Sequence, residues 1–123
     1  MAHGTFAWNE LMTTDVEKAK QFYAKTVGWQ MEGMPMAHGT YWIAKADGKP
    51  VAGIMGMVPD APAGTPPHWL GYLEVDDVDA RAKSVTANGG TVMRQPFDIP
   101  DVGRIAIVAD ATGAVMGMMT PKR

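Results

Sequence analysis

The sequence predicts an α+β fold made of two tandem βαβββ modules. The first observation is an internal repeat, because Asp15 recurs as Asp77 and Gly28 recurs as Gly90, each 62 residues later. The second is the order of the patterns, since each half carries a strand pattern, a helix pattern and then three more strand patterns. The third is the length of 123 residues, because a half of about 60 residues buries too little surface to be stable alone.

Module one spans residues 1–57 and begins with a strand over residues 4–12, where side-chain polarity alternates. A helix over residues 15–26 is expected next, with Thr14 and Glu17 in the arrangement of a capping box. Three further strands are expected over residues 29–33, 41–45 and 51–57, with Asp47-Gly48 as the hairpin turn between the last two.

A linker over residues 58–67 joins the modules, because its four prolines exclude a helix or a central strand. Module two spans residues 68–123 and repeats the pattern of module one. It is expected to hold a strand over 68–75, a helix over 77–87, and strands over 91–94, 103–109 and 115–119. A turn over residues 110–113 connects the last two strands, and residues 96–100 are expected to form a loop.

Composition excludes several classes of protein. The absence of cysteine excludes disulfide frameworks, thiolate metal sites and cysteine nucleophiles. A formal net charge of −2 argues against nucleic-acid and anionic-membrane partners. The chain has no apolar run near the roughly 20 residues that cross a bilayer, and its N-terminus lacks the pattern of a signal peptide. We therefore expect a cytoplasmic protein with no nucleic-acid partner and no membrane partner.

Several short motifs occur in the same order as in one known superfamily. Module one carries Asp15-Val-Glu-Lys-Ala-Lys-Gln-Phe22-Tyr23 and Gly28-Trp29, and module two carries Val75-Asp-Asp-Val78, Gly89-Gly90 and Asp110-x-x-Gly113. Through these motifs essentially the whole chain resembles the vicinal oxygen chelate superfamily, which includes glyoxalase I, bleomycin-resistance proteins and extradiol dioxygenases. The resemblance implies a curled mixed sheet around a ligand-binding cleft. It also implies a homodimer, with a monomer that closes its own cleft as the alternative.

The resemblance also implies where a metal would be bound. Enzymes of the superfamily hold a divalent metal at four equivalent strand positions, typically through His, Gln and Glu. Motif spacing places Trp8 and Leu70 at the two first-strand positions. Gly117 takes one last-strand position, and Met55 or Gly56 takes the other. None of these residues is a suitable ligand, so no metal and no other cofactor is predicted.

The three histidines are the remaining candidate metal ligands. His3 and His38 are expected at the surface, whereas His68 lies on the same strand face as Leu70, near the mouth of the expected cleft. Glu10 is the one carboxylate on the face of Trp8. A single carboxylate with remote imidazoles makes a weak metal site.

Strand alternation defines the candidate ligand-binding residues, because every second side chain of a strand points to the same face. Around Trp8 and Leu70 this gives Phe6, Trp8, Glu10, His68, Leu70 and Tyr72, and the resemblance adds Gly117 at the last-strand position. Glu10 and Tyr72 are related by the offset of the repeat and are expected to form a polar pair that orients a hydroxyl or an amine of the ligand. Glu10 is also the candidate catalytic residue, as a general base. A structural hydrogen bond inside the core is the alternative.

Three functions are compatible with these residues. The favoured one is a metal-free, bleomycin-resistance-like protein that binds a partly apolar or aromatic small molecule in the cleft. The second is an enzyme, either a divalent-metal-dependent lyase, isomerase or dioxygenase with an atypical site, or a metal-free catalyst that uses Glu10. The third is a structural or interaction module whose methionines and aromatic residues fill its own cleft. The sequence leaves all three open.

Overall fold

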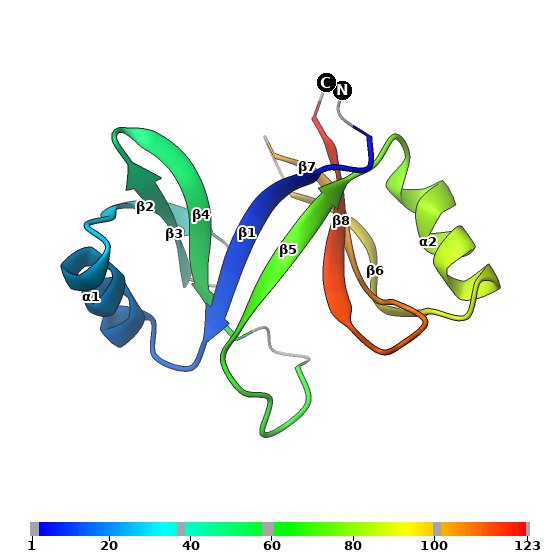
Figure 1. The fold of residues 1–123 in the computed structure, drawn as a ribbon, viewed down its shortest axis with the longest axis horizontal. Coiled ribbons are helices and arrows are strands. Elements are labelled where there is room, and N and C mark those ends of the chain that lie inside the picture. Colours follow the sequence, from blue (N-terminus) through cyan, green and yellow to red (C-terminus); the bar gives the residue numbers. More distant parts are fainter. Residues whose placement is uncertain (1–2, 37–38, 58–60, 100–101, 123) are drawn as a thin grey trace. The chain divides into compact units, whose positions relative to one another are not determined.

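A computed structural model of the chain describes residues 3–36, 39–57, 61–99 and 102–122 (Figure 1). These residues form an α+β fold in which a strand, a helix and three strands occur in this order twice, as predicted. The chain divides into two compact units. The first unit is Trp8–Trp69, and the second unit is Met1–Ala7 with Leu70–Arg123.

The first unit contains one helix and a four-stranded mixed sheet. Its elements are β1 (Phe6–Thr13, from residue 8 onward), α1 (Val16–Thr26), β2 (Gln30–Met36), β3 (Gly39–Ala46) and β4 (Lys49–Gly56). The strands lie in the order β2-β3-β4-β1, in which β1 and β4 are parallel and the other neighbours are antiparallel. The core of this sheet includes Ala44 and Ile54, whose side chains are completely buried.

The second unit repeats this topology. Its elements are β5 (His68–Glu74, from residue 70 onward), α2 (Val78–Ala87), β6 (Thr91–Ile99), β7 (Gly103–Ala109) and β8 (Val115–Pro121). The strands lie in the order β5-β8-β7-β6, with β5 parallel to β8. Val78 of α2 packs with Val75 and Ala106 in the core. Ahead of β1, the backbone N–H of Gly4 donates to the Glu74 carbonyl at 2.7 Å.

Helix α1 starts with a different cap from the predicted one. Asp15 is the N-cap, and its Oδ1 accepts a hydrogen bond from the Lys18 backbone N–H at 3.0 Å. The predicted capping box of Thr14 and Glu17 is therefore wrong. Two adjacent residues are both good N-caps, and the extended backbone that a cap requires falls on Asp15, with a φ of −141°. Gly28 follows the helix with a φ of +79°, as its predicted role as helix stop requires.

Strand β6 corrects the predicted loop over residues 96–100. The strand continues through Pro96 to Ile99, and the last residue of the predicted loop lies outside the described residues. Between Arg94 and Phe97, β6 has two residues where β7 has one, which is a β-bulge. A proline is tolerated at a bulge in an outermost strand, because no ladder hydrogen bond needs its missing N–H.

Both predicted turns are confirmed. Asp47 and Gly48 have φ values of +52° and +77°, the left-handed pair that a tight two-residue hairpin requires. In the turn before β8, Asp110 Oδ1 accepts hydrogen bonds from the backbone N–H groups of Thr112 at 2.8 Å and Ala114 at 3.0 Å. Both turns depend on the conformation or the hydrogen bonds of a few neighbouring residues, which explains why they could be predicted from the sequence.

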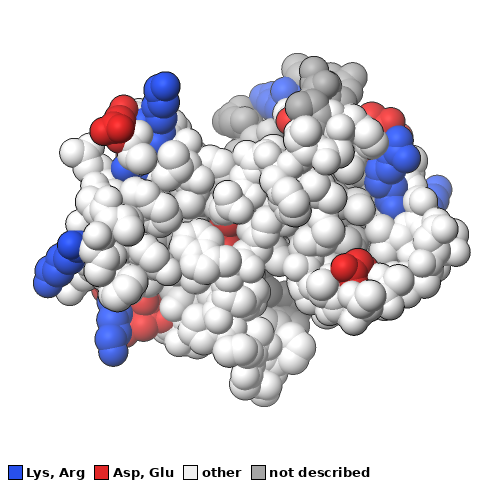
Figure 2. Space-filling model, in the orientation of Figure 1, with Lys and Arg blue, Asp and Glu red and all other residues white. Residues whose placement is uncertain are grey.

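The charged side chains form mixed clusters on the face drawn in Figure 2, where lysine and arginine lie beside aspartate and glutamate. Arg104 illustrates the pattern, since its guanidinium binds Asp79 at 2.7 Å and Asp98 at 3.2 Å. The predicted absence of a nucleic-acid partner stays a prediction. In the described part of the chain, neither helix is long and apolar enough to cross a membrane.

We expect Asp76 to make the stability of the second unit sensitive to acid. Arg81 binds both carboxylate oxygens at 2.8 and 2.9 Å, and these hydrogen bonds lower the pKa of Asp76 to about 2. Because the folded-state pKa is lowered, the contribution is complete above the ordinary pKa near 4 and is lost as the pH falls towards 2. The difference in urea midpoint between wild type and Arg81→Gln should therefore shrink between pH 5 and pH 2. A constant difference would contradict this.

Candidate functional site

The predicted ligand-binding residues divide between the two units. Trp8, Glu10 and His68 lie in the first unit, and Phe6, Leu70, Tyr72 and Gly117 lie in the second. The predicted pairing of Glu10 with Tyr72 would join the two units, and it stays a prediction, as does the cleft.

In the first unit the structure connects Glu10 and Trp8 through a third residue, Tyr41. The indole Nε1 of Trp8 donates a hydrogen bond to the Tyr41 hydroxyl at 2.9 Å, and that hydroxyl donates to Glu10 Oε2 at 2.8 Å. Glu10 is 7% exposed, whereas Trp8 and Tyr41 are half-buried. We call Trp8, Tyr41 and Glu10 the polar chain. We take it as the candidate site, because it joins a carboxylate to two aromatic side chains.

The sheet register brings the polar chain together. Glu10 of β1 pairs with Gly53 of β4, and Gly53 pairs on its other side with Ile43 of β3. Tyr41 lies two residues before Ile43, so its ring can pass diagonally over β4 towards β1. The ring passes directly over Gly53, where an added Cβ would stand 1.6 Å from the Tyr41 hydroxyl oxygen. The polar chain therefore depends on a residue without a side chain in the middle of β4.

Burial of Tyr41 determines where its proton resides. Desolvation raises the pKa of Tyr41 well above its usual value, because the phenolate form is disfavoured away from water. The negative charge of Glu10 raises this pKa further, and the hydrogen bond from Trp8 opposes the shift. Tyr41 therefore keeps its proton at neutral pH and acts as a donor towards Glu10.

A tyrosine also covers a glycine in the second unit. Tyr72 of β5 pairs with Gly117 of β8, and an added Cβ on Gly117 would stand 2.2 Å from the ring of Tyr72. Tyr72 is 3% exposed and Leu70, two residues earlier, is 1% exposed. Each unit thus has a glycine in its last strand and a tyrosine ring over it, which we call the glycine–tyrosine pair.

The register corrects one position derived from sequence spacing. Glu10 and Tyr72 are equivalent first-strand residues, and their partners in the last strands are Gly53 and Gly117. The counterpart of Gly117 is therefore Gly53, and its assignment to Met55 or Gly56 is wrong. The error arose because the position was found by counting residues from a turn. A difference in loop length between the two modules shifts such a count, whereas the pairing of hydrogen-bonded strands does not depend on loop length.

The residues at the four implied ligand positions do not fit a divalent metal. The two last-strand positions are glycines, and the tyrosine rings occupy the space that a ligating side chain would need. Leu70 is apolar and buried, and the indole nitrogen of Trp8 is a donor that is bonded to Tyr41. In the described ranges, no three His, Cys, Asp or Glu side chains gather where they could hold a metal ion.

The remaining predicted residues lie as follows. Phe6 is 68% exposed. His3 is at the surface, as expected, and its Nδ1 accepts a hydrogen bond from the Asp76 backbone N–H at 3.0 Å. His68 is half-buried, and its Nδ1 lies 2.8 Å from the Pro66 carbonyl oxygen. His38 lies outside the described residues. Phe6 and His68 therefore stay predictions as ligand-binding residues.

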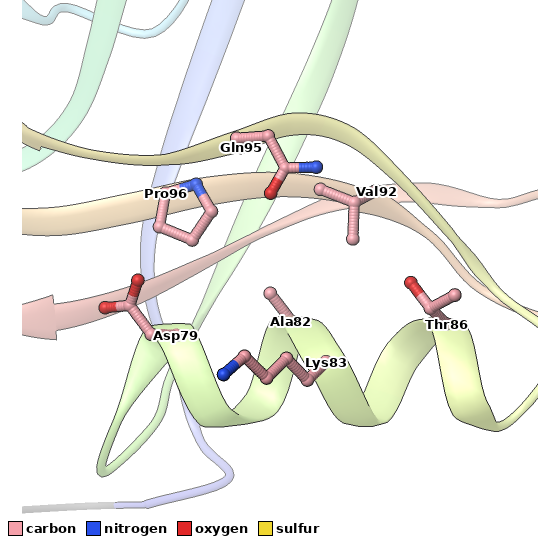
Figure 3. A pocket seen from close by; sticks show the side chains of 7 residues that line it. All are labelled: Asp79, Ala82, Lys83, Thr86, Val92, Gln95 and Pro96. Carbon is pink, nitrogen blue, oxygen red and sulfur yellow. The ribbon is translucent and has the colours of Figure 1, made fainter.

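A small pocket of about 150 Å³ lies between α2 and β6 in the second unit (Figure 3). Its lining consists of Asp79, Ala82, Lys83, Thr86, Val92, Gln95 and Pro96. Arg104 already binds the Asp79 carboxylate, at 2.7 and 3.0 Å. The pocket contains none of the predicted site residues, so the candidate site remains at the polar chain.

Comparison with known sequences identifies the relatives of the chain. Residues 5–116 match the family model described as "Glyoxalase/Bleomycin resistance protein/Dioxygenase superfamily". The chain is 43% identical over 122 residues to "Putative glyoxylase CFP32" of Mycobacterium tuberculosis, covering 98% of this chain and 47% of that protein. It is 34% identical over 130 residues to "Anthracycline biosynthesis protein DnrV" of Streptomyces peucetius, covering 95% and 47%. The chain spans about half the length of these relatives.

Solved structures with the same fold are more distant in sequence. Methylmalonyl-CoA epimerase from Mycobacterium tuberculosis matches with a TM-score of 0.68 and 14% identity, over 98% of this chain and 89% of that chain. A hypothetical protein from Bacillus halodurans, BH1468, matches with a TM-score of 0.71 and 12% identity, over 99% and 97%. At these identities the likeness shows the fold alone.

Proposed function

This chain belongs to the glyoxalase/bleomycin resistance protein/dioxygenase superfamily, and on that premise we propose that it binds a small, partly apolar or aromatic molecule without a divalent metal. The observation that carries the proposal is the glycine–tyrosine pair in each unit. In each unit a tyrosine ring takes the space that a ligating side chain would need at the last-strand position, which supports a site without a metal.

The polar chain supplies the other requirement of such a site. Ligand sites combine apolar and aromatic walls with a small number of polar groups that orient the ligand. Trp8 and Tyr41 are half-buried and offer part of their ring surface, while Glu10 supplies a carboxylate at their centre. One relative is named an anthracycline biosynthesis protein, which makes hydroxylated aromatic molecules of that type the first probes to test.

A metal-free enzyme is the second candidate function. Its basis is Glu10, a buried carboxylate that is held in one orientation by the Tyr41 hydroxyl. A carboxylate in this setting can act as a general base towards a bound ligand. Conversion of the bound probe, followed by mass spectrometry and lost in Glu10→Gln, would establish the enzyme. If the probe is unchanged after prolonged incubation, the chain binds the probe without converting it.

We also propose that the chain forms a homodimer. The relatives are about twice as long as this chain, so two copies have the length of one relative. Light scattering of the purified chain should then give about twice its mass of 13.2 kDa. A mass of one chain across the concentration range would exclude the homodimer.

We expect a hydroxylated aromatic probe to change the tryptophan fluorescence with equal affinity before and after treatment with a chelator. The chain has four tryptophans, so Trp8→Phe identifies the reporter and should remove most of the change. Trp42→Phe is the matched control, because Trp42 lies under the Lys20 ammonium, 3.2 Å from its ring centroid. A probe affinity that disappears with the chelator and returns with Zn²⁺, Mn²⁺ or Fe²⁺ would overturn the metal-free proposal.

A further inference from the structure

We infer that the pocket between α2 and β6 is a second ligand site, which binds a small carboxylate through the ammonium group of Lys83. The pocket lies entirely within the second unit, whereas the polar chain lies in the first. The inference therefore goes beyond the proposed function, and either of the two can fail without the other.

A β-bulge builds one wall of the pocket. Successive side chains of a regular strand point to opposite faces, so Gln95 and Pro96 would be expected on different faces of β6. Both line the pocket, because they are the two residues of the bulge that oppose one residue of β7. Bulges are frequent beside functional sites, where they redirect a side chain. Here the bulge turns the Gln95 side chain towards α2, as Figure 3 shows.

The base of the pocket is apolar. Ala82 of α2 is 4% exposed, and Val92 and Pro96 of β6 are half-buried. The exposed lining residues with uncharged or basic polar groups are Lys83, Thr86 and Gln95. An apolar base with a few polar groups that fix the orientation of the ligand is the usual composition of a small-molecule site.

The charges around the pocket leave a lysine without a counter-ion. Asp79 is the acidic residue of the lining, and Arg104 binds both of its carboxylate oxygens, at 2.7 and 3.0 Å. These hydrogen bonds lower the pKa of Asp79, and the charge of Lys83, one helical turn later, adds a smaller contribution. Among the described residues, Lys83 makes no ion pair within 4 Å. Its ammonium can therefore take a counter-ion from a ligand.

The polar groups of the lining favour a ligand that accepts hydrogen bonds. The Lys83 ammonium is a donor only, the Gln95 carboxamide adds an NH₂ group and the Thr86 hydroxyl adds one more donor. Within the described ranges, these three side chains have no hydrogen-bond partner. A carboxylate accepts about four hydrogen bonds and supplies the negative charge that Lys83 lacks. A ligand ammonium would instead meet the like charge of Lys83.

The volume of the pocket limits the size of the ligand. The pocket measures about 150 Å³, and a cavity of this volume can hold a benzene molecule. Drug-sized ligands occupy pockets of about 300 Å³ or more. The ligand is therefore a carboxylate on a short aliphatic chain or a single ring, whose body lies against the apolar base.

The test is an NMR titration of the isotope-labelled full chain at pH 7 with three probes that share one ring, namely benzoate, benzyl alcohol and benzylammonium. Benzoate should shift the backbone signals of α2 and β6 around the pocket. It should bind at least about tenfold more tightly than the alcohol or the ammonium, the scale of one hydrogen bond to a charged group.

Lys83→Met tests the residue itself, because methionine keeps an unbranched side chain and removes the charge. Benzoate should lose about tenfold in affinity at the pocket, while benzyl alcohol changes by less than about threefold. Lys83→Arg keeps the charge and should keep the benzoate affinity within about threefold. The matched control is Lys25→Met, which removes an exposed lysine from α1 in the first unit and should leave all affinities unchanged. Both lysines are exposed, so these variants should fold as wild type does.

Several results would overturn the inference and leave the proposed function standing, since tryptophan fluorescence tests that function separately. One is the absence of shifts in α2 and β6 at about ten times the millimolar affinity that is ordinary for so small a ligand. Equal affinities for benzoate and benzyl alcohol would overturn the ligand class. An unchanged benzoate affinity in Lys83→Met would overturn the assigned residue. Shifts confined to Trp8 and Tyr41 would place benzoate at the polar chain, against this inference and in favour of the proposed function.

Discussion

Replacing Gly117 with alanine is expected to destabilise the second unit by about 1–3 kcal/mol or more, the cost of overpacking a filled core. An added Cβ would stand 2.2 Å from Cδ2 and 2.8 Å from Cγ of Tyr72. Cγ is the base of the ring, so rotation of the ring cannot remove the clash. Tyr72 is 3% exposed and has little space into which it can shift. Urea unfolding, followed by circular dichroism, measures the effect.

Gly56→Ala is the matched control for Gly117→Ala. Gly56 is the last residue of β4 and has no neighbouring atom within 4 Å of an added Cβ, so the same change should be nearly neutral. A second variant tests whether the clash with the Tyr72 ring is the cause. Tyr72→Leu should lower the free energy of unfolding less in the Gly117→Ala background than in wild type. Equal costs in both backgrounds, or equal effects at the two glycines, would show that the ring does not occupy the space above Gly117.

Leu70→Ala is expected to destabilise the second unit by about 2–5 kcal/mol, since it removes a buried side chain and leaves a cavity. Leu70 is 1% exposed and lies in β5, at a position where metal-binding members of the superfamily are expected to carry a ligand. The large cost would follow from its role in the core. Chemical denaturation with a two-state fit provides the measurement.

Met93→Ala is the control for Leu70→Ala, because Met93 lies in the same unit and is 51% exposed. Its removal should change the free energy of unfolding by no more than about 0.5 kcal/mol. If Leu70→Ala were as mild as Met93→Ala, the side chain of Leu70 would not be part of the core, and its position could again be considered for ligand binding.

Local patterns account for the elements that were predicted. The helix stop at Gly28 and the turn at Asp47-Gly48 need a left-handed backbone, which the residue type itself supplies. The start of α1 shows the limit of such patterns, because Thr14 and Asp15 are both good caps and only the backbone conformation distinguishes them. Pro96 shows the same limit. Whether a proline ends a strand depends on whether that strand is outermost and bulged, as β6 is, and this depends on strand pairing.

The candidate site was predictable in part. Trp8 and Glu10 lie two residues apart on one strand, so alternation alone places them on one face. Tyr41 was missed, because it is 31 residues from Glu10 and reaches it only through the pairing of β3 and β4. One signal was present, since Gly53 lies in the middle of a strand, where a glycine often marks the close approach of another group.

The sequence by itself determined the two βαβββ modules and their turns, because these depend on contacts within a few residues. Only the tertiary structure decided that Gly53 is the counterpart of Gly117 and that Tyr41 connects Trp8 to Glu10. Strand register and ring packing arise from contacts between residues that are distant in the sequence, so the spacing of residues along the chain does not predict them. For that reason the sequence pointed to a site without metal ligands, and the structure was needed to find the hydrogen-bonded chain at that site.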